Sequence, residues 1–197
     1  FGFKYTFMIT AVAISIAALG VVFGIKEKRS DPARRKEKPV SPLAVIKQIV
    51  SRRILITVMV IALLIQMANF CVQPLLALYV SHLTSSGNIA FLSGLAFSAT
   101  GFGNLLLTRQ WGMLGDKYGH ARILLILLVL ACAFMVPQAL VSHLWQLIIL
   151  RFLFGMVIGG MNPSIVAFIR LEAPLSMQGE VLGYNQSFRF LGNVTGP

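Results

Sequence analysis

The chain has 197 residues, of which 57% are hydrophobic and only 12% are charged. Soluble domains carry about a quarter charged residues, so this composition argues against a water-soluble globule. The formal net charge of +11 is confined to a few gaps between long uncharged runs, which favours a membrane surface over nucleic acid as the partner of the basic residues.

Apolar runs without Asp, Glu, Lys or Arg predict membrane-spanning helices in the first half of the chain, since one span needs about 20 such residues. The first predicted span is Tyr5 to Ile25. The run from Ile54 to Thr108 is too long for one helix and is broken by the turn-forming segment Ser81 to Asn88, so it predicts two spans.

The second half of the chain continues this pattern. The run from Ile123 to Ile169 contains one charge, Arg151, and divides into two predicted spans at Pro137 to Gln146. A last apolar run, Val181 to Pro197, begins another span with Arg189 in its middle. We therefore predict an all-α, polytopic membrane protein.

The basic residues predict how the spans are oriented, because Lys and Arg accumulate in cytoplasmic loops. Residues 26–53 hold ten Lys and Arg against three Asp and Glu, whereas the gaps at 81–88 and 137–146 hold no Lys or Arg. We expect a multi-pass protein of the cell (plasma or inner) membrane, with residues 26–53 as a basic cytoplasmic linker.

Two parts of this linker differ in their predicted structure. Ser30 to Pro42 contains proline and charge without an apolar period, so we expect it to be solvated. Lys47 to Arg53 is either a short amphipathic segment on the inner surface or a plain positive flank of the next span.

The ends of the sequence suggest an excerpt, because residue 1 is Phe and the first residues lack the features of a signal peptide. We expect residues 1–25 to be the last helix of an N-terminal helical bundle that is otherwise missing. Residues 54–197 are expected to belong to the following bundle, with an incomplete last helix. This layout is typical of a two-bundle transporter, and the missing bundle is an expected partner.

The short basic gap after residue 111 reads GMLGDKYGHAR. It resembles the G-x-L-a-D-r-x-G-r-k sequence that major facilitator transporters carry between helices two and three and, more weakly, between helices eight and nine. The matching residues are Gly112, Leu114, Asp116, Lys117 and Gly119, while His120 and Ala121 replace a basic pair and Arg122 is displaced. These departures are more like the second copy, which implies that the chain runs from helix six into helix eleven of a major facilitator type bundle.

Two further segments resemble motifs of the same family. Arg151 to Gly160 is similar to the R-x-x-x-G-x-x-x-G pattern of helix four, here at the pseudo-equivalent helix ten. Gly192 to Pro197 is similar to the G-x-x-x-G-P core of the antiporter motif of helix five, here at helix eleven. Small residues at this spacing occur where membrane helices approach closely. The expected helix-packing residues are Gly155, Gly159, Gly192, Gly196 and Pro197.

The resemblance implies a gating role for the loop, in which it latches neighbouring helices in one of two alternating conformations. Gly112 and Gly119 are expected to permit the reversal between helices, and Asp116 is expected to cap a helix N-terminus. Lys117 and Arg122 are expected to pair with acids or phospholipid headgroups. The alternative is a well-capped tight turn with ordinary positive-inside residues.

The span after the linker carries three amides, Gln66, Asn69 and Gln73. At 100° per residue around a helix axis, they lie within about 60° of one another. Unpaired amides are costly in lipid, so this face is expected to meet protein or a water-filled cavity. Because helix seven of the family faces the central cavity, the resemblance implies that this face is part of the substrate pathway, with interhelical hydrogen bonding as the alternative.

Arg151 and Asn162 lie three turns apart and are expected to project from one side of their helix. A guanidinium inside the membrane costs about 2.5 kcal/mol or more and normally has a partner. Because Arg151 lies near the interface marked by Trp145, a pathway role and snorkelling to the outer surface both stay open.

The last span has a polar face that contains Asn185, Gln186, Arg189 and Asn193. Arg189 is the deepest cation and our strongest candidate for a functional charge, which either attracts an anionic group or pairs with a carboxylate across the bundle. Asn185 is assigned to the substrate pathway with it. A structural ion pair with a residue outside the excerpt is the alternative.

Acids are scarce in the spans: Asp116, Glu172 and Glu180 are the only ones after the linker, and none lies deep in a span. Since proton coupling usually uses a buried carboxylate, a proton-driven mechanism needs its main proton site elsewhere. Cys71 and Cys132 lie in apolar runs and are interpreted as small buried hydrophobes. We expect no metal, no cofactor and no catalytic residues.

The function favoured by these patterns is secondary active transport of a small amphipathic or lipophilic solute by alternating access. The resemblance is strongest to bacterial multidrug efflux proteins, so drug export coupled to protons is the leading hypothesis. The expected partners are the lipid bilayer, a small-molecule substrate and protons. The alternatives are a proton-coupled uptake symporter for a small metabolite and a non-transporting membrane receptor.

Overall fold

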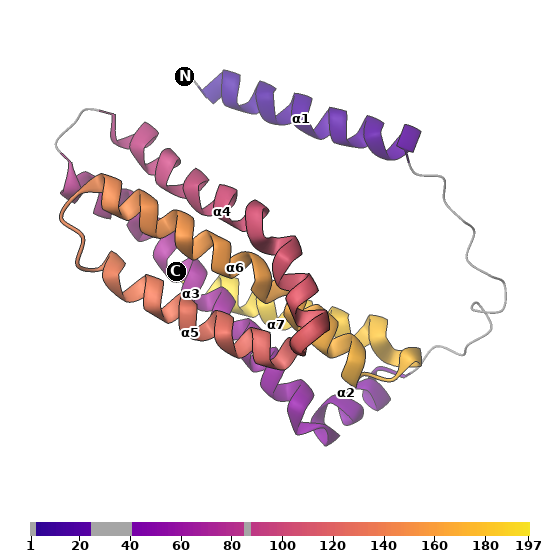
Figure 1. The fold of residues 1–197 in the computed structure, drawn as a ribbon. Helices are drawn as coiled ribbons and strands as arrows, with labels where there is room; N and C mark the ends of the chain where they lie inside the picture. Colours follow the sequence, from indigo (N-terminus) through magenta and orange to yellow (C-terminus); the bar gives the residue numbers. More distant parts are fainter. Residues whose placement is uncertain (1–2, 25–40, 85–87) are drawn as a thin grey trace. The chain divides into compact units, whose positions relative to one another are not determined.

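The computed structural model describes residues 3–24, 41–84 and 88–197, and all the regular structure in these ranges is helical (Figure 1). The chain divides into two units, at residues 1–39 and 40–197. The first contains α1 (Phe3–Gly24), a helix of 22 residues that overlaps the first predicted span, Tyr5 to Ile25.

The second unit is a helical bundle. It contains the short helix α2 (Pro42–Ser51), a 3₁₀ turn and five longer helices. Their bounds are α3 (Arg53–Leu83), α4 (Ile89–Tyr118), α5 (His120–Gln138), α6 (Leu144–Glu172), the 3₁₀ turn η2 (Leu175–Met177) and α7 (Gln178–Thr195).

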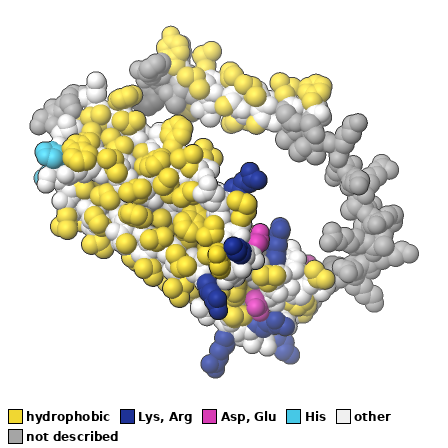
Figure 2. Space-filling model, in the orientation of Figure 1, with side chains coloured by type: hydrophobic (Ala, Val, Ile, Leu, Met, Phe, Trp, Pro, Cys, Tyr) yellow, Lys and Arg dark blue, Asp and Glu magenta, His cyan; other side chains and the backbone are white. Residues whose placement is uncertain are grey.

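Within the described ranges, α3, α4, α5 and α6 are long and apolar enough to cross a membrane. The predicted breaks are confirmed, because α3 gives way to α4 and α5 to α6 inside the two uncharged gaps. The charged side chains gather toward the end of the bundle that holds α2, whereas the flank visible in Figure 2 is mostly hydrophobic. We call this end, which includes the α4–α5 and α6–α7 turns, the basic end.

Helix α2 corrects the predicted linker boundary. Ser41 caps the helix by accepting a hydrogen bond from the Ala44 N–H at 3.3 Å, and Pro42 occupies the first turn, where its missing N–H costs nothing. Val45 and Ile49, four residues apart, are buried against the bundle core. Residues 41–51 therefore belong to the folded bundle, and the amphipathic segment begins earlier than Lys47; the solvated linker expected before residue 41 lies outside the described residues.

Close backbone contacts arrange the longer helices. Helix α6 lies between α4 and α5 (Figure 1). A Cβ atom at Gly155 would collide with the Thr100 carbonyl of α4, and one at Gly159 would lie 2.7 Å from the Asn104 carbonyl oxygen. The indole Nε1 of Trp111 in α4 also donates to the Met156 carbonyl of α6 at 2.8 Å. The helices α4 and α6 thus meet backbone to backbone.

Helix α7 packs on α3 in a similar way. A Cβ atom at Gly192 would lie 2.5 Å from the Leu63 carbonyl oxygen, and one at Gly196 would lie 2.7 Å from the Met67 carbonyl oxygen. Both glycines are buried, whereas Pro197 is exposed. The two glycines bring the polar face of α7 against α3.

Candidate functional site

The polar contact between α3 and α7 centres on Arg189. Its side chain is half-buried, and its Nη1 donates to Gln186 Oε1 on the same helix at 3.0 Å. Its Nη2 lies 3.5 Å from Gln66 Oε1 on α3, which makes this a long hydrogen bond across the two helices. Within the described ranges no carboxylate pairs with the guanidinium, which has five N–H donors and therefore keeps donors for another group.

The other polar residues of α7 lie in different environments. Asn185 is only 2% exposed, and its Oδ1 atom has no hydrogen-bond donor among the described residues. The Oδ1 atom of Asn193 is likewise buried and without a donor there, whereas Gln186 is exposed. The predicted polar face therefore presents a partly accessible charge beside α3 and buried amide oxygens that have no donor among the described residues.

The three amides of α3 do not share one environment, contrary to the prediction from their spacing. Gln66 faces Arg189 of α7. Asn69 instead donates to the Ile65 carbonyl at 3.0 Å and lines a cavity on the side of α5 and α6. Gln73 is exposed. A difference of about 60° around the helix is enough to place Gln66 and Asn69 against different neighbours.

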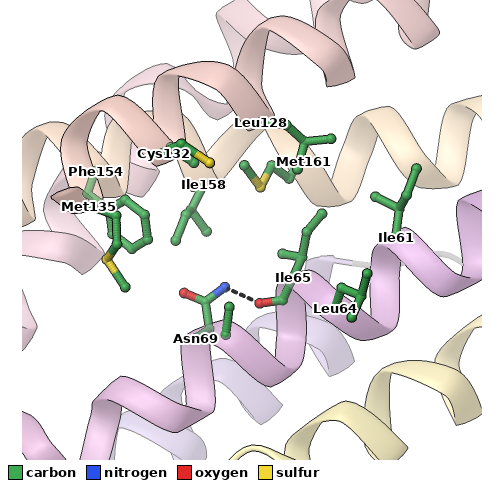
Figure 3. Close-up of a pocket in the computed structure, with 12 residues that line it drawn as sticks. Ile61, Leu64, Ile65, Asn69, Leu128, Cys132, Met135, Phe154, Ile158 and Met161 are labelled. Carbon is green, nitrogen blue, oxygen red and sulfur yellow. Dashed lines mark hydrogen bonds between the residues drawn. The ribbon is translucent and has the colours of Figure 1, made fainter.

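The cavity beside Asn69 has a volume of about 320 Å³ and is lined by α3, α5 and α6 (Figure 3). All its other lining side chains are apolar or contain sulfur. They are Ile61, Leu64, Ile65, Ala68, Leu128, Ala131, Cys132, Met135, Phe154, Ile158 and Met161. Sequence reasoning missed this cavity because apolar side chains in a membrane span carry no signal that separates a cavity wall from a lipid-facing surface.

A second cavity, of about 350 Å³, is formed by the same three helices and shares Met135 with the first. Its polar lining residues are Tyr79, Gln138 and Arg151. Arg151 is only 6% exposed, so its side chain does not snorkel to the surface. Asn162 is exposed, and the pair expected on one side of α6 therefore lies in two different surroundings.

The cysteines lie differently from the prediction. Cys71 and Cys132 are both exposed in the described bundle, and Cys132 lines the first cavity. Their interpretation as small buried hydrophobes is therefore wrong for this structure.

The turn between α4 and α5 depends on Gly119 alone for its reversal. Gly119 has φ of +94°, a conformation that side-chain-bearing residues rarely adopt. Gly112 lies inside α4, six residues before its end, so the prediction that it permits the reversal is wrong.

Asp116 also departs from its predicted role. It lies in the last turn of α4, and the start of α5 has no side-chain cap. Its Oδ1 instead lies 3.3 Å from Nε2 of His120, the first residue of α5. Lys117 stacks over the Tyr118 ring, with Nζ 5.2 Å from its centre, and Arg122 is exposed. Asp116 thus joins the two helices through an imidazole.

A second contact at the basic end was not predicted. Arg52, at the break between α2 and α3, donates through Nη1 to the Glu172 carbonyl of α6 at 3.0 Å and lies 3.8 Å from the Glu172 carboxylate. Gln178 donates to the Arg170 carbonyl at 2.7 Å across the α6–α7 turn. The sequence shows that Glu172 is one of few acids and that residues 26–53 are rich in Lys and Arg. These two facts could have predicted an ion pair, but not that Arg52 is the partner.

Comparison with known proteins gives a consistent result along the whole chain. The family model described as Major Facilitator Superfamily matches residues 1–197. The chain is 55% identical over its full length to a Bacillus subtilis protein named as an uncharacterized MFS-type transporter, YuxJ, and covers 50% of it. It is 38% and 35% identical to proteins of Dickeya zeae and Salmonella arizonae named multidrug resistance protein MdtG, and covers 48% of each. The chain thus spans about half the length of these curated relatives.

Proposed function

The chain belongs to the Major Facilitator Superfamily, and from this premise we propose that the whole protein exports amphipathic or lipophilic solutes by alternating access of two helical bundles. The MdtG relatives, whose name refers to multidrug resistance, favour export of drug-like compounds. On this proposal the bundle that begins at α2 supplies one side of the solute pathway.

The contact of Arg189 with Gln66 is the observation that carries this proposal. A charged group packed against the membrane-length helix α3 is costly unless it meets polar partners, and here the partners are neutral amides rather than a carboxylate. The guanidinium therefore keeps its charge available to a solute or to the opposite bundle. Arg189, Gln66 and Asn185 form the proposed polar part of the pathway.

Proton coupling is the proposed driving force. The three acids that follow residue 53 lie at the ends of helices, where Asp116 meets His120 and Glu172 meets Arg52. On this proposal, the carboxylate that exchanges protons lies outside residues 54–197, and the α4–α5 turn contributes to gating. The basic end of the bundle faces the cytoplasm, as the positive-inside rule requires.

Dye accumulation in everted membrane vesicles tests this function with the complete protein. Vesicles that contain the protein should accumulate a fluorescent lipophilic cation when energised, and a protonophore should abolish the accumulation. Accumulation that is insensitive to the protonophore would refute proton antiport, and outward movement of the dye from the same vesicles would indicate uptake into cells instead of export.

A further inference from the structure

Among the side chains whose burial is described, Arg151 is the only buried Lys or Arg. Its Nε atom is buried, and among the described residues it has neither a hydrogen-bond acceptor nor a carboxylate that pairs with it. A buried guanidinium without a counter-charge is unfavourable, and pairing with a carboxylate is the most effective way to compensate it, because two parallel N–H···O bonds form.

We propose that the two cavities between α3, α5 and α6 form one groove that binds a single-chain amphipathic carboxylate. The carboxylate pairs with Arg151, and the apolar chain extends past Met135 into the cavity beside Asn69. This binding site is separate from the polar contact of Arg189 with α3, and it does not depend on the proposed export function.

The shape of the groove fits such a ligand. Both cavities are lined by the same three helices and share Met135, so they lie next to each other along the bundle. The first cavity is apolar except for Asn69, whose amide nitrogen already donates to the Ile65 carbonyl (Figure 3). Leu64 and Leu75, which line the two cavities on α3, are more than half exposed, so the groove is open along its side.

The charge pattern of the groove selects an anion. The hydroxyl of Tyr79 donates to the Gln138 carbonyl at 2.9 Å, and the Gln138 Nε2 donates to the Phe134 carbonyl at 3.0 Å. The Tyr79 hydroxyl therefore joins α3 to α5, the Gln138 side-chain N–H bonds within α5, and both donors are already engaged. Arg151 is the charged group of the lining and is left to recognise the ligand, while the lining contains no acid that would attract a cation.

The two cysteines provide matched probes of the groove. Cys132 is exposed and lines the apolar cavity, whereas Cys71 is exposed on α3 and lines neither cavity. In the full-length protein, each is retained as the single cysteine, with every other cysteine replaced by serine, and is labelled with a maleimide in membranes. Dodecanoate is the probe ligand, and dodecyltrimethylammonium, which has the same chain and the opposite charge, is its control.

Dodecanoate is expected to slow the labelling of Cys132 by about fivefold once most of the groove is occupied, and to leave Cys71 unaffected. Dodecyltrimethylammonium should protect neither cysteine. Arg151→Gln should abolish the protection, whereas Arg151→Lys, which retains the charge, should keep part of it.

Three results would each overturn the proposal. Equal protection of both cysteines would indicate a general effect of the amphiphile on the membrane. Protection of Cys132 that persists in Arg151→Gln would show that the charge plays no part. A Cys132 that does not react even without ligand, in protein whose Cys71 reacts normally, would show that another segment of the full-length protein covers the groove.

Discussion

Two helix contacts in the bundle, α4 with α6 and α3 with α7, each contain two glycines four residues apart. The hydrogen bonds made by the polar side chains near these glycines differ between the two contacts. Against α6, Thr108 of α4 donates to the Asn104 carbonyl of its own helix. Against α3, Arg189 of α7 reaches across to Gln66. Around the first pair of glycines, the Thr108 hydroxyl thus bonds within its own helix and the neutral Trp111 indole reaches across to α6, whereas the second contact places a charged side chain between the helices.

This difference separates two uses of the same small-residue spacing. Between α4 and α6 the backbones approach so closely that even a methyl group at Gly155 has no space, which favours tight packing. Between α3 and α7 the glycines bring a charged donor to a neighbouring helix and leave it incompletely paired. We expect the first contact to determine stability and the second to determine transport.

Gly155→Ala should have the largest effect on the amount of protein. The added Cβ meets the Thr100 backbone, which cannot move without shifting α4, and overpacking of this kind costs about 1–3 kcal/mol. Membrane abundance of the full-length protein should fall severalfold. Gly101→Ala, on α4 with open space around it, is the matched control and should leave abundance unchanged. Normal abundance of both variants would contradict the stabilising role assigned to the contact between α4 and α6.

Arg189→Ala should have the largest effect on transport at constant abundance. The guanidinium donors that remain beside Gln186 and Gln66 are proposed to bind the solute. Loss of a hydrogen bond to a charged group costs about 1.5–3 kcal/mol, which corresponds to a fall in transport of about tenfold or more. Dye transport in vesicles, normalised to protein amount, measures it, with the exposed Arg109→Ala as the control. If transport and abundance fall together, Arg189 belongs to folding and the contrast between the two contacts disappears.

Gly192→Ala should have an intermediate effect. Its Cβ would lie 2.5 Å from the Leu63 carbonyl oxygen and 3.1 Å from Gln66 Cβ, so α7 must move away from α3 and from the partner of Arg189. We expect a partial loss of transport, greater than the loss of abundance, in the same vesicle assay. Gly183→Ala, on α7 with no atoms nearby, should behave as wild type. A loss of abundance as great as that of Gly155→Ala would make the two contacts equivalent.

Gly119→Ala should have the smallest effect of the four. The φ of +94° is strained for alanine by about 1–3 kcal/mol, but there is open space around the residue and the strain is confined to one turn. The apparent melting temperature of the purified full-length protein should fall by a few degrees. Gly112→Ala, in the helical part of the same motif with open space, should raise it slightly or leave it unchanged.

Much of the bundle could be predicted from sequence, because each helix is a long apolar run and each break is a cluster of turn-forming or charged residues. Gly155, Gly159, Gly192 and Gly196 were identified by their resemblance to family motifs together with their spacing, and the structure places all four close to a neighbouring helix. Such features are local, so the sequence contains them directly.

The candidate site was less predictable because it depends on which helices become neighbours. Gln66 and Asn69 share a face of α3 within about 60°, yet one meets α7 and the other meets the cavity beside α5. Asp116 has the side chain of an N-cap, but α4 continues past it to Tyr118 and leaves it facing His120. Spacing gives the direction of a side chain around its own helix and not the identity of what it meets.

The hydrogen bond from Trp111 to the Met156 carbonyl restricts the relative motion of α4 and α6. Sliding of one helix along the other would break this bond and drive the glycines of α6 out of their positions beside Thr100 and Asn104. We therefore expect the two helices to move as one rigid body. If the bundle changes shape, we expect the change at helix contacts that are made by side chains alone. There, side chains can change rotamer without a shift of the backbone.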